Sequence, residues 1–153
     1  MFIKQLSVFL ENREGRLEDV LRVLKNNKVN VVSLSLADTQ EFGILRLLVD
    51  KVDMAYSALQ RNGFSARVTD VLAVKVAHQV GMLQELLAAL GSAHINVEYM
   101  YALSVGEKEA SIILKTSDLA LAGEILHKNG AGIVKPDEIG LDFKDREAYN
   151  KLS

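Results

Sequence analysis

The chain contains one sequence pattern twice, at a period of 66 residues. Residues 15–31 read GRLEDVLRVLKNNKVNV and residues 81–97 read GMLQELLAALGSAHINV, and six of these 17 positions are identical. The identical pairs are Gly15/Gly81, Leu17/Leu83, Leu21/Leu87, Leu24/Leu90, Asn30/Asn96 and Val31/Val97. Two long copies are too few for a solenoid, so each copy is expected to be a small folding unit.

The first copy predicts a β-α-β-β-α-β order. The apolar residues Leu17, Val20, Leu21 and Leu24 follow the i, i+3, i+4, i+7 spacing of a helix. Strands are expected at 3–10, 29–37, 42–50 and 64–70, where apolar residues alternate or run together. A second helix is expected from Asp50, as its N-cap, to Asn62-Gly63, where glycine accepts a left-handed conformation.

The second copy predicts the same order. Strands are expected at 71–77, 95–105, 108–116 and 131–135, with helices at 82–93 and 118–129. Ser117 is the expected cap of the last helix, and Asn129-Gly130 ends it.

Such a unit predicts an α+β fold, a ferredoxin-like sandwich whose strands one and three are central. We expect two of these sandwiches, at residues 1–70 and 71–137, followed by a C-terminal tail at 138–153. Pairing of the two second strands would cover exposed edges. It would give one eight-stranded antiparallel sheet with four helices on one face.

Composition excludes several classes of function. The 153 residues carry a formal net charge of −2, which disfavours a nucleic-acid surface, and no apolar run is long enough to span a membrane. There is no cysteine, hence no disulfide or thiolate chemistry. The three histidines share no ligand spacing, so no metal or cofactor is expected. The start of the chain lacks the pattern of a secretory signal, and we expect a cytoplasmic protein.

The candidate site in each copy combines the loop before the first helix with the asparagine that opens strand two. These residues are Asn12, Arg13, Gly15, Leu17 and Asn30 in the first copy, and His78, Gln79, Gly81, Leu83 and Asn96 in the second. A helix N-terminus favours a carboxylate, and a glycine lets a ligand approach the backbone. An asparagine amide can both donate and accept. The alternative is that the asparagines only end turns that the glycines permit.

These motifs resemble the ACT domain, a small regulatory module of amino-acid metabolism. LENREGRL at 10–17 with KVNVVSLS at 28–35, and VGML at 80–83 with HINVEYM at 94–100, carry the glycine-leucine and hydrophobic-Asn-hydrophobic steps. The resemblance covers residues 1–137. It implies that a free amino acid binds between paired domains, and it implicates Asn12 and Asn30, with His78 in the place of Asn12 in the second copy.

We therefore expect a non-catalytic tandem ACT protein with an amino-acid effector, acting with a second copy as a homodimer or with a partner enzyme. One alternative is a regulatory subunit that docks on an amino-acid biosynthetic enzyme, such as an acetolactate-synthase-type small subunit. Another is an acylphosphatase-like enzyme on a similar fold. That enzyme would need an arginine in the first loop, and Arg13 has only Gln79 as its counterpart.

Overall fold

The computed structural model describes residues 2–38 and 40–141. The chain divides into two compact units, and the described residues of each come from two segments. The N-terminal unit contains residues 4–70 and 136–141, and the C-terminal unit contains residues 2–3 and 71–135. Residues 142–153, most of the expected tail, lie outside the described residues.

The N-terminal unit has the predicted β-α-β-β-α-β order. Its elements are β1 (Ile3–Glu11), α1 (Arg16–Asn26), β2 (Val31–Asp38), β3 (Phe42–Val49), α2 (Val52–Arg61), the first half of β4 (Ser65–Ala77) and a 3-10 turn, η1 (Pro136–Ile139). The hydrogen-bonded strand order is β2-β3-β1-β4. Strands one and three of this copy are therefore central, as the sequence predicts.

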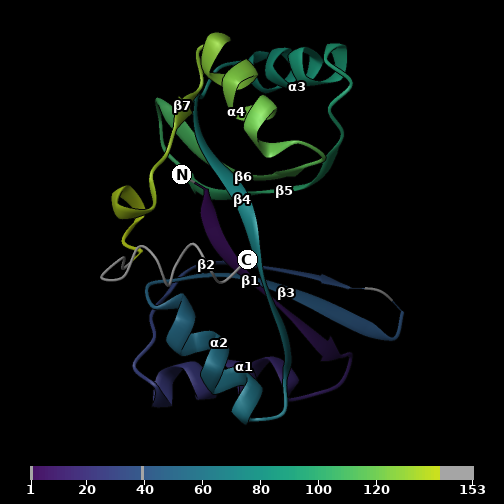
Figure 1. The fold of residues 1–153 in the computed structure, drawn as a ribbon, viewed down its shortest axis with the longest axis vertical. Coiled ribbons are helices and arrows are strands. Elements are labelled where there is room, and N and C mark those ends of the chain that lie inside the picture. The colour runs from purple at the N-terminus through teal and green to yellow at the C-terminus, as the bar shows by residue number, and fades with distance from the viewer. Residues whose placement is uncertain (1, 39, 142–153) are drawn as a thin grey trace. The chain divides into compact units, whose positions relative to one another are not determined.

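The C-terminal unit repeats this arrangement. It contains the second half of β4, α3 (Met82–Ser92), β5 (Val97–Val105), β6 (Glu109–Thr116), α4 (Leu119–Lys128) and β7 (Gly132–Ile133). The neighbours in the sheet are β7-β4-β6-β5. In both units the two helices lie on one face of the strands (Figure 1).

The expected strands 64–70 and 71–77 form one continuous strand, β4. It serves as strand four of the N-terminal unit and strand one of the C-terminal unit, so the described residues contain seven strands instead of the predicted eight. No glycine or proline interrupts residues 65–77, and nothing local ends the strand. The predicted pairing of the two second strands is wrong within this chain, because β2 and β5 are at opposite ends of the strand order β2-β3-β1-β4-β6-β5.

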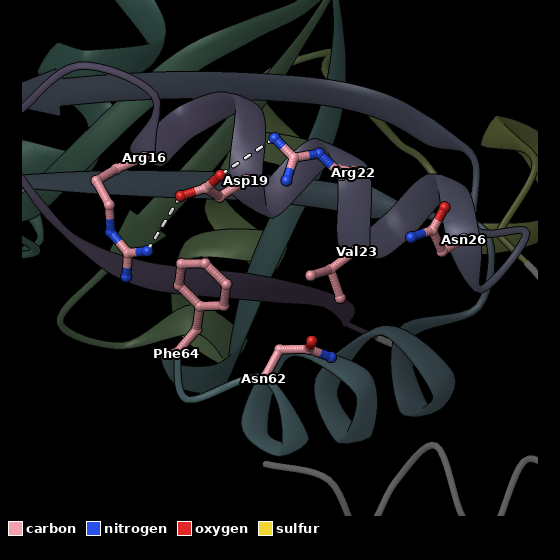
Figure 2. A pocket seen from close by; sticks show the side chains of 7 residues that line it. All are labelled: Arg16, Asp19, Arg22, Val23, Asn26, Asn62 and Phe64. Carbon is pink, nitrogen blue, oxygen red and sulfur yellow. Dashed lines mark hydrogen bonds and ion pairs between the residues drawn. The ribbon is translucent and has the colours of Figure 1, made fainter.

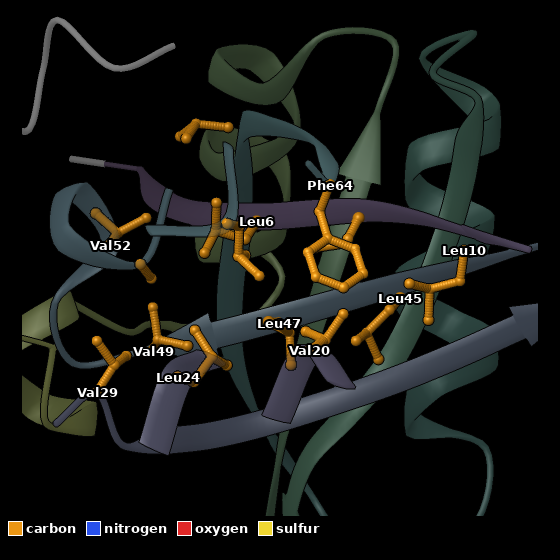
Figure 3. Packing of buried hydrophobic residues seen from close by; sticks show 14 residues of the cluster. Leu6, Leu10, Val20, Leu24, Val29, Leu45, Leu47, Val49, Val52 and Phe64 are labelled. Carbon is orange, nitrogen blue, oxygen red and sulfur yellow. The ribbon is translucent and has the colours of Figure 1, made fainter. Parts of the chain in front are cut away.

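The core of the N-terminal unit lies between the helices and one sheet face. Val20 and Leu24 of α1, from the predicted apolar stripe, are 0% and 1% exposed. They pack among alternate residues of the central strands, including Leu6, Leu45 and Leu47 (Figure 3). Burial of an apolar side chain of this size contributes about 1.5–3 kcal/mol, so the face that points at the helices determines the strand register.

The C-terminal unit has a core of its own. Leu86 and Leu90 of α3 pack with Leu72 and Val74 of β4 and Leu126 of α4. None of the helices in the described part of the chain is long and apolar enough to cross a membrane.

Candidate functional site

In the N-terminal unit the candidate loop connects β1 to α1. The backbone N–H of Asn12 donates to the carbonyl of Glu41 (3.2 Å), and the N–H of Arg13 donates to the carbonyl of Glu11 (2.9 Å). The Arg13 guanidinium also donates to the carboxylate of Glu11 (Nε–Oε2, 2.8 Å). Asn12 and Arg13 are exposed, so this loop presents polar side chains to solvent.

The C-terminal unit builds the same loop with different side chains. The N–H of His78 donates to the carbonyl of Lys108, and the N–H of Gln79 to that of Ala77, both at 2.9 Å. In addition, His78 Nδ1 lies 2.8 Å from the carbonyl oxygen of Gly106. Because a carbonyl oxygen only accepts, Nδ1 is the donor in this bond. This bond ties the loop to the β5–β6 turn.

Gly15 and Gly81 end the two loops in the same left-handed conformation. Their φ angles are 82° and 85°, and no side chain caps α1 or α3. A Cβ built on either glycine would meet nothing within 4 Å. The constraint on these positions is therefore conformational, and the space around the Cβ position is open.

Leu17 and Leu83 follow the glycines one residue further into each helix. Leu17 is partly buried against the N-terminal core, whereas Leu83 is 39% exposed. The two leucines are identical in sequence and differ in how much apolar surface they leave near the loop.

Asn30 and Asn96 hold the start of strand two through their backbones. The N–H of Asn30 donates to Oδ1 of Asp50 (2.9 Å) and its carbonyl accepts from the N–H of Asp50 (3.1 Å). Asn96 makes the same pair of bonds with Ser117 (3.1 and 3.0 Å). Both asparagine residues are exposed, so their amide groups are available at the surface.

These bonds correct the two predicted helix caps. Asp50 does not cap α2, whose N-cap position is Lys51. Ser117 does not cap α4, because Asp118 does so by accepting from the N–H of Leu121 (3.0 Å). Asp50 and Ser117 instead satisfy the N–H of the strand-two asparagine. The sequence analysis missed them as partners of that asparagine, although they occupy equivalent places in the two copies.

The structure brings the loop residues together but not the loop and the asparagine of the same unit. Asn12 and Gly15 precede α1, and Asn30 follows its last residues. An 11-residue helix is about 16 Å long, which exceeds the length of a free amino acid. The same holds for Gly81 and Asn96 at the two ends of α3. A free amino acid therefore cannot contact the loop and the asparagine of one unit at the same time.

A surface hollow of about 520 Å³ adjoins the loop of the C-terminal unit. It is lined by Lys75, Ser104, Gly106, Lys108, Glu109 and Ser111. Gly106 and Lys108 are also the partners of His78. Lysine ammonium groups and a glutamate carboxylate at one opening can complement the opposite charges of a zwitterion. Sequence spacing could not reveal this hollow, because its residues come from three strands and the β5–β6 turn.

The titratable side chains of the described residues do not gather into a metal centre. No group of three histidine or carboxylate residues with metal-binding geometry occurs among residues 2–38 and 40–141.

Comparisons with known proteins agree with this architecture. A family model described as an ACT domain pair matches residues 1–140. Protein BT0572 from Bacteroides thetaiotaomicron has a similar structure with a TM-score of 0.84 and 33% sequence identity, over 92% of this chain and 96% of that chain.

Two more distant structures share the fold. The ligand-free regulatory subunit of aspartate kinase from Thermus thermophilus has a TM-score of 0.60 and 18% identity, over 84% of this chain and 94% of that one. The corresponding subunit from Thermus flavus has a TM-score of 0.57 and 17% identity, over 84% and 93%. No curated protein matches the sequence. From the family match over both repeats, together with the 33% identical structure, we conclude that the chain belongs to the family of paired ACT domains.

Proposed function

We propose that this protein is a non-catalytic regulatory protein of the cytoplasm that binds a free amino acid. The ligand carboxylate would occupy the open space before Gly15 or Gly81, at the uncapped start of a helix. The ammonium and the remaining carboxylate oxygen would meet a strand-two asparagine. Ligand binding would then be relayed to a partner, either a second copy of the chain or an enzyme.

The observation that carries the proposal is the repetition of the site geometry. The loop glycines have φ angles of 82° and 85°, and Lys28 and His94, just before the asparagines, have φ angles of 54° and 58°. Positive φ is unfavourable for a residue with a side chain. Both units keep it at the same place, and each thereby presents its asparagine at the strand start.

Since the loop and the asparagine lie at opposite ends of one helix, we propose that each amino acid is held between two ACT units. One unit supplies the glycine loop and the other supplies the asparagine. The hollow beside His78 makes the loop of the C-terminal unit the better candidate of the two.

The first experiment is thermal unfolding of the full chain with each of the twenty amino acids at millimolar concentration. A ligand present at 100 times its Kd adds about 2.7 kcal/mol to the free energy of unfolding. For a chain of this length each kcal/mol raises the midpoint by roughly 2–4 °C. If no amino acid raises the midpoint, the proposal is wrong.

The site is tested with Asn30→Ala and Asn96→Ala, singly and combined. The fold contacts of both asparagines use backbone atoms, so the variants should fold. The double variant should lose the ligand-induced shift, and Gln84→Ala, an exposed polar residue of α3, should retain it. A shift that survives in the double variant would remove the asparagines from the site.

A second candidate function is that of a regulatory subunit docked on an amino-acid biosynthetic enzyme. It is favoured by the fold and length of the aspartate kinase regulatory subunit from Thermus thermophilus, 94% of which is covered by this chain. Co-expression with the catalytic chain of an aspartate kinase or an acetolactate synthase would test it. The expected result is co-elution with one enzyme and feedback inhibition that depends on this chain.

The acylphosphatase-like activity has less support. The one loop arginine, Arg13, already donates to the carboxylate of Glu11, and its counterpart Gln79 carries no charge.

A further inference from the structure

The N-terminal unit has a second hollow, on the surface of α1 from Arg16 to Asn26, lined by residues other than those of the candidate site. Its volume is about 360 Å³. The lining residues are Arg16, Asp19, Arg22, Val23 and Asn26 of α1, with Asn62 and Phe64 from the end of α2 and the loop after it (Figure 2). None of these seven residues belongs to the proposed amino-acid site.

Arg16 is held in this hollow by two contacts. Its guanidinium carbon lies 4.5 Å from the centre of the Phe64 ring, a cation–π arrangement. Its Nη1 donates to Oδ2 of Asp19 (3.2 Å), and the Arg16 side chain is 22% exposed. Arg16 therefore presents a positioned cation, instead of a mobile one at the end of a free side chain.

Donor groups of Arg16 remain for another partner. Its Nε is buried and makes no hydrogen bond to any of the described residues. A buried donor without a partner costs about 1–3 kcal/mol. A carboxylate in the hollow can meet the guanidinium edge, and a small rotation over the Phe64 ring brings Nε into the same bidentate arrangement.

The neighbouring polar groups leave Arg16 as the available cation. Arg22 donates to both Glu18 and Asp19, and its hydrogen bond to Glu18 raises the pKa of Arg22, so that it stays charged. The Nδ2 of Asn62 donates one hydrogen to the carbonyl of Ala58 (2.8 Å), which leaves its second hydrogen to donate to a ligand carboxylate. Val23 and Phe64 supply apolar walls.

The C-terminal unit shows that the fold does not require these residues. At the period of 66, Arg16 and Arg22 correspond to Met82 and Ala88. Alignment of Asn62-Gly63 with Asn129-Gly130 places Ala131 opposite Phe64. Both units form the same helices and strands, and only the N-terminal unit has guanidinium groups and an aromatic ring at these places. A purely structural need would apply to both units.

We propose that this hollow is a second ligand site, specific to the N-terminal unit, which binds a small carboxylate anion through Arg16. The second Nδ2–H of Asn62 donates to the ligand carboxylate, and Val23 and Phe64 contact the ligand's carbon atoms. The site uses none of the residues of the candidate amino-acid site, and the described residues of the C-terminal unit have no equivalent of it.

The test is a titration of the full ¹⁵N-labelled chain with sodium succinate, followed by NMR at constant ionic strength. Neutral succinamide is the matched probe. Succinate should move the Arg16 Nε–H and Asn62 amide signals saturably at millimolar concentration, and succinamide should move neither. No saturable shift, or equal shifts with both probes, would overturn the proposal.

Variants separate this site from other effects. Arg16→Met keeps an unbranched chain over Phe64 and should weaken succinate binding at least tenfold, whereas Arg67→Met, at an exposed position of β4, removes the same charge and should not change it. Asn26→Asp, at an exposed position, places a negative charge at the rim of the hollow and should weaken succinate binding severalfold. It is the second test if Arg16→Met folds poorly. Unchanged binding in a folded Arg16→Met, or in Asn26→Asp, would refute the assignment. Asn30→Ala with Asn96→Ala should bind succinate normally, so this test and that of the proposed function fail independently.

Discussion

The ammonium of Lys4 lies 2.6 Å from Oδ1 of Asp70, and the two residues occupy equivalent positions of the repeat, 66 residues apart. Lys4 is 5% exposed and Asp70 is 27% exposed. Identical copies would have placed like charges together at this distance, which is destabilising. Divergence of the two copies to opposite charges turns the same proximity into a charge-assisted hydrogen bond.

The first prediction concerns this ion pair. Asp70→Asn removes the negative charge beside an almost fully buried ammonium, and we expect the free energy of unfolding to fall by about 1.5–3 kcal/mol. Urea denaturation of the full chain measures the loss. Asp38→Asn, at an exposed position of β2, is the control and should change stability by less than about 0.5 kcal/mol. A double-mutant cycle with Lys4→Met that shows no coupling would contradict the interpretation.

The second prediction concerns the left-handed loop glycine. Gly81→Ala should lower the free energy of unfolding by about 1–2 kcal/mol, because a residue with a Cβ is strained at φ 85°. Gly91→Ala, inside α3, is the matched control. A Cβ at either position meets no atom within 4 Å, so space is equal and only the backbone conformation differs. Gly91→Ala should stabilise the chain by about 0.5–1 kcal/mol. Equal effects of both substitutions on the urea midpoint would contradict this reasoning.

The third prediction separates the true cap of α4 from the residue that the sequence favours. Asp118→Ala removes the acceptor for the N–H of Leu121 and should cost about 1 kcal/mol. Ser117→Ala removes the acceptor for the N–H of Asn96 instead, at a cost of about 0.5–1.5 kcal/mol. Amide hydrogen exchange distinguishes them. Asp118→Ala should speed exchange at Leu121, and Ser117→Ala should speed exchange at Asn96. The reverse assignment would restore Ser117 as the cap.

Sequence periodicity was sufficient to predict the helices, the element order and the central strands, because the apolar positions that define them are local. It failed where one acceptor side chain could bond either to the helix that follows it or to a distant strand. A short acceptor before a helix reads as a cap, yet Asp50 and Ser117 bond to an asparagine that precedes them by 20 and 21 residues. The fusion of two expected strands into β4 was missed for a related reason. A strand shared by two units carries no local signal other than the absence of a turn.

For the candidate sites, too, the sequence indicated the residues that are contiguous and not those that the fold brings together. The loop motifs are contiguous in sequence, so Gly15 and Gly81 were found together with their neighbours. The hollow beneath Arg16 combines α1 with Phe64, almost fifty residues away, and no spacing rule connects them. A comparison of the two copies could have drawn attention to it, since Arg16 and Arg22 face Met82 and Ala88 in an otherwise similar helix.

The last prediction uses the N-terminal unit as a guide to a stabilising substitution in the C-terminal unit. Thr116 of β6 is 2% exposed, and its hydroxyl has no hydrogen-bond partner among the described residues. Its cross-strand partner is Val97, and in the N-terminal unit the equivalent partner of Val31 is Val49, a buried valine. Thr116→Val should therefore raise the free energy of unfolding by about 1 kcal/mol, because it replaces an unsatisfied buried hydroxyl with a methyl of similar volume.

The reverse substitution, Val49→Thr, is the matched control for this prediction. It places a hydroxyl in the N-terminal core and should lower the free energy of unfolding by about 1–3 kcal/mol. Urea denaturation of both variants under the same conditions measures the two effects. Loss of stability in Thr116→Val would show that the hydroxyl has a partner in solution. Opposite signs for the two variants would show that the same strand position prefers valine in both units, because in each it faces a core built from the same repeated helix and strands.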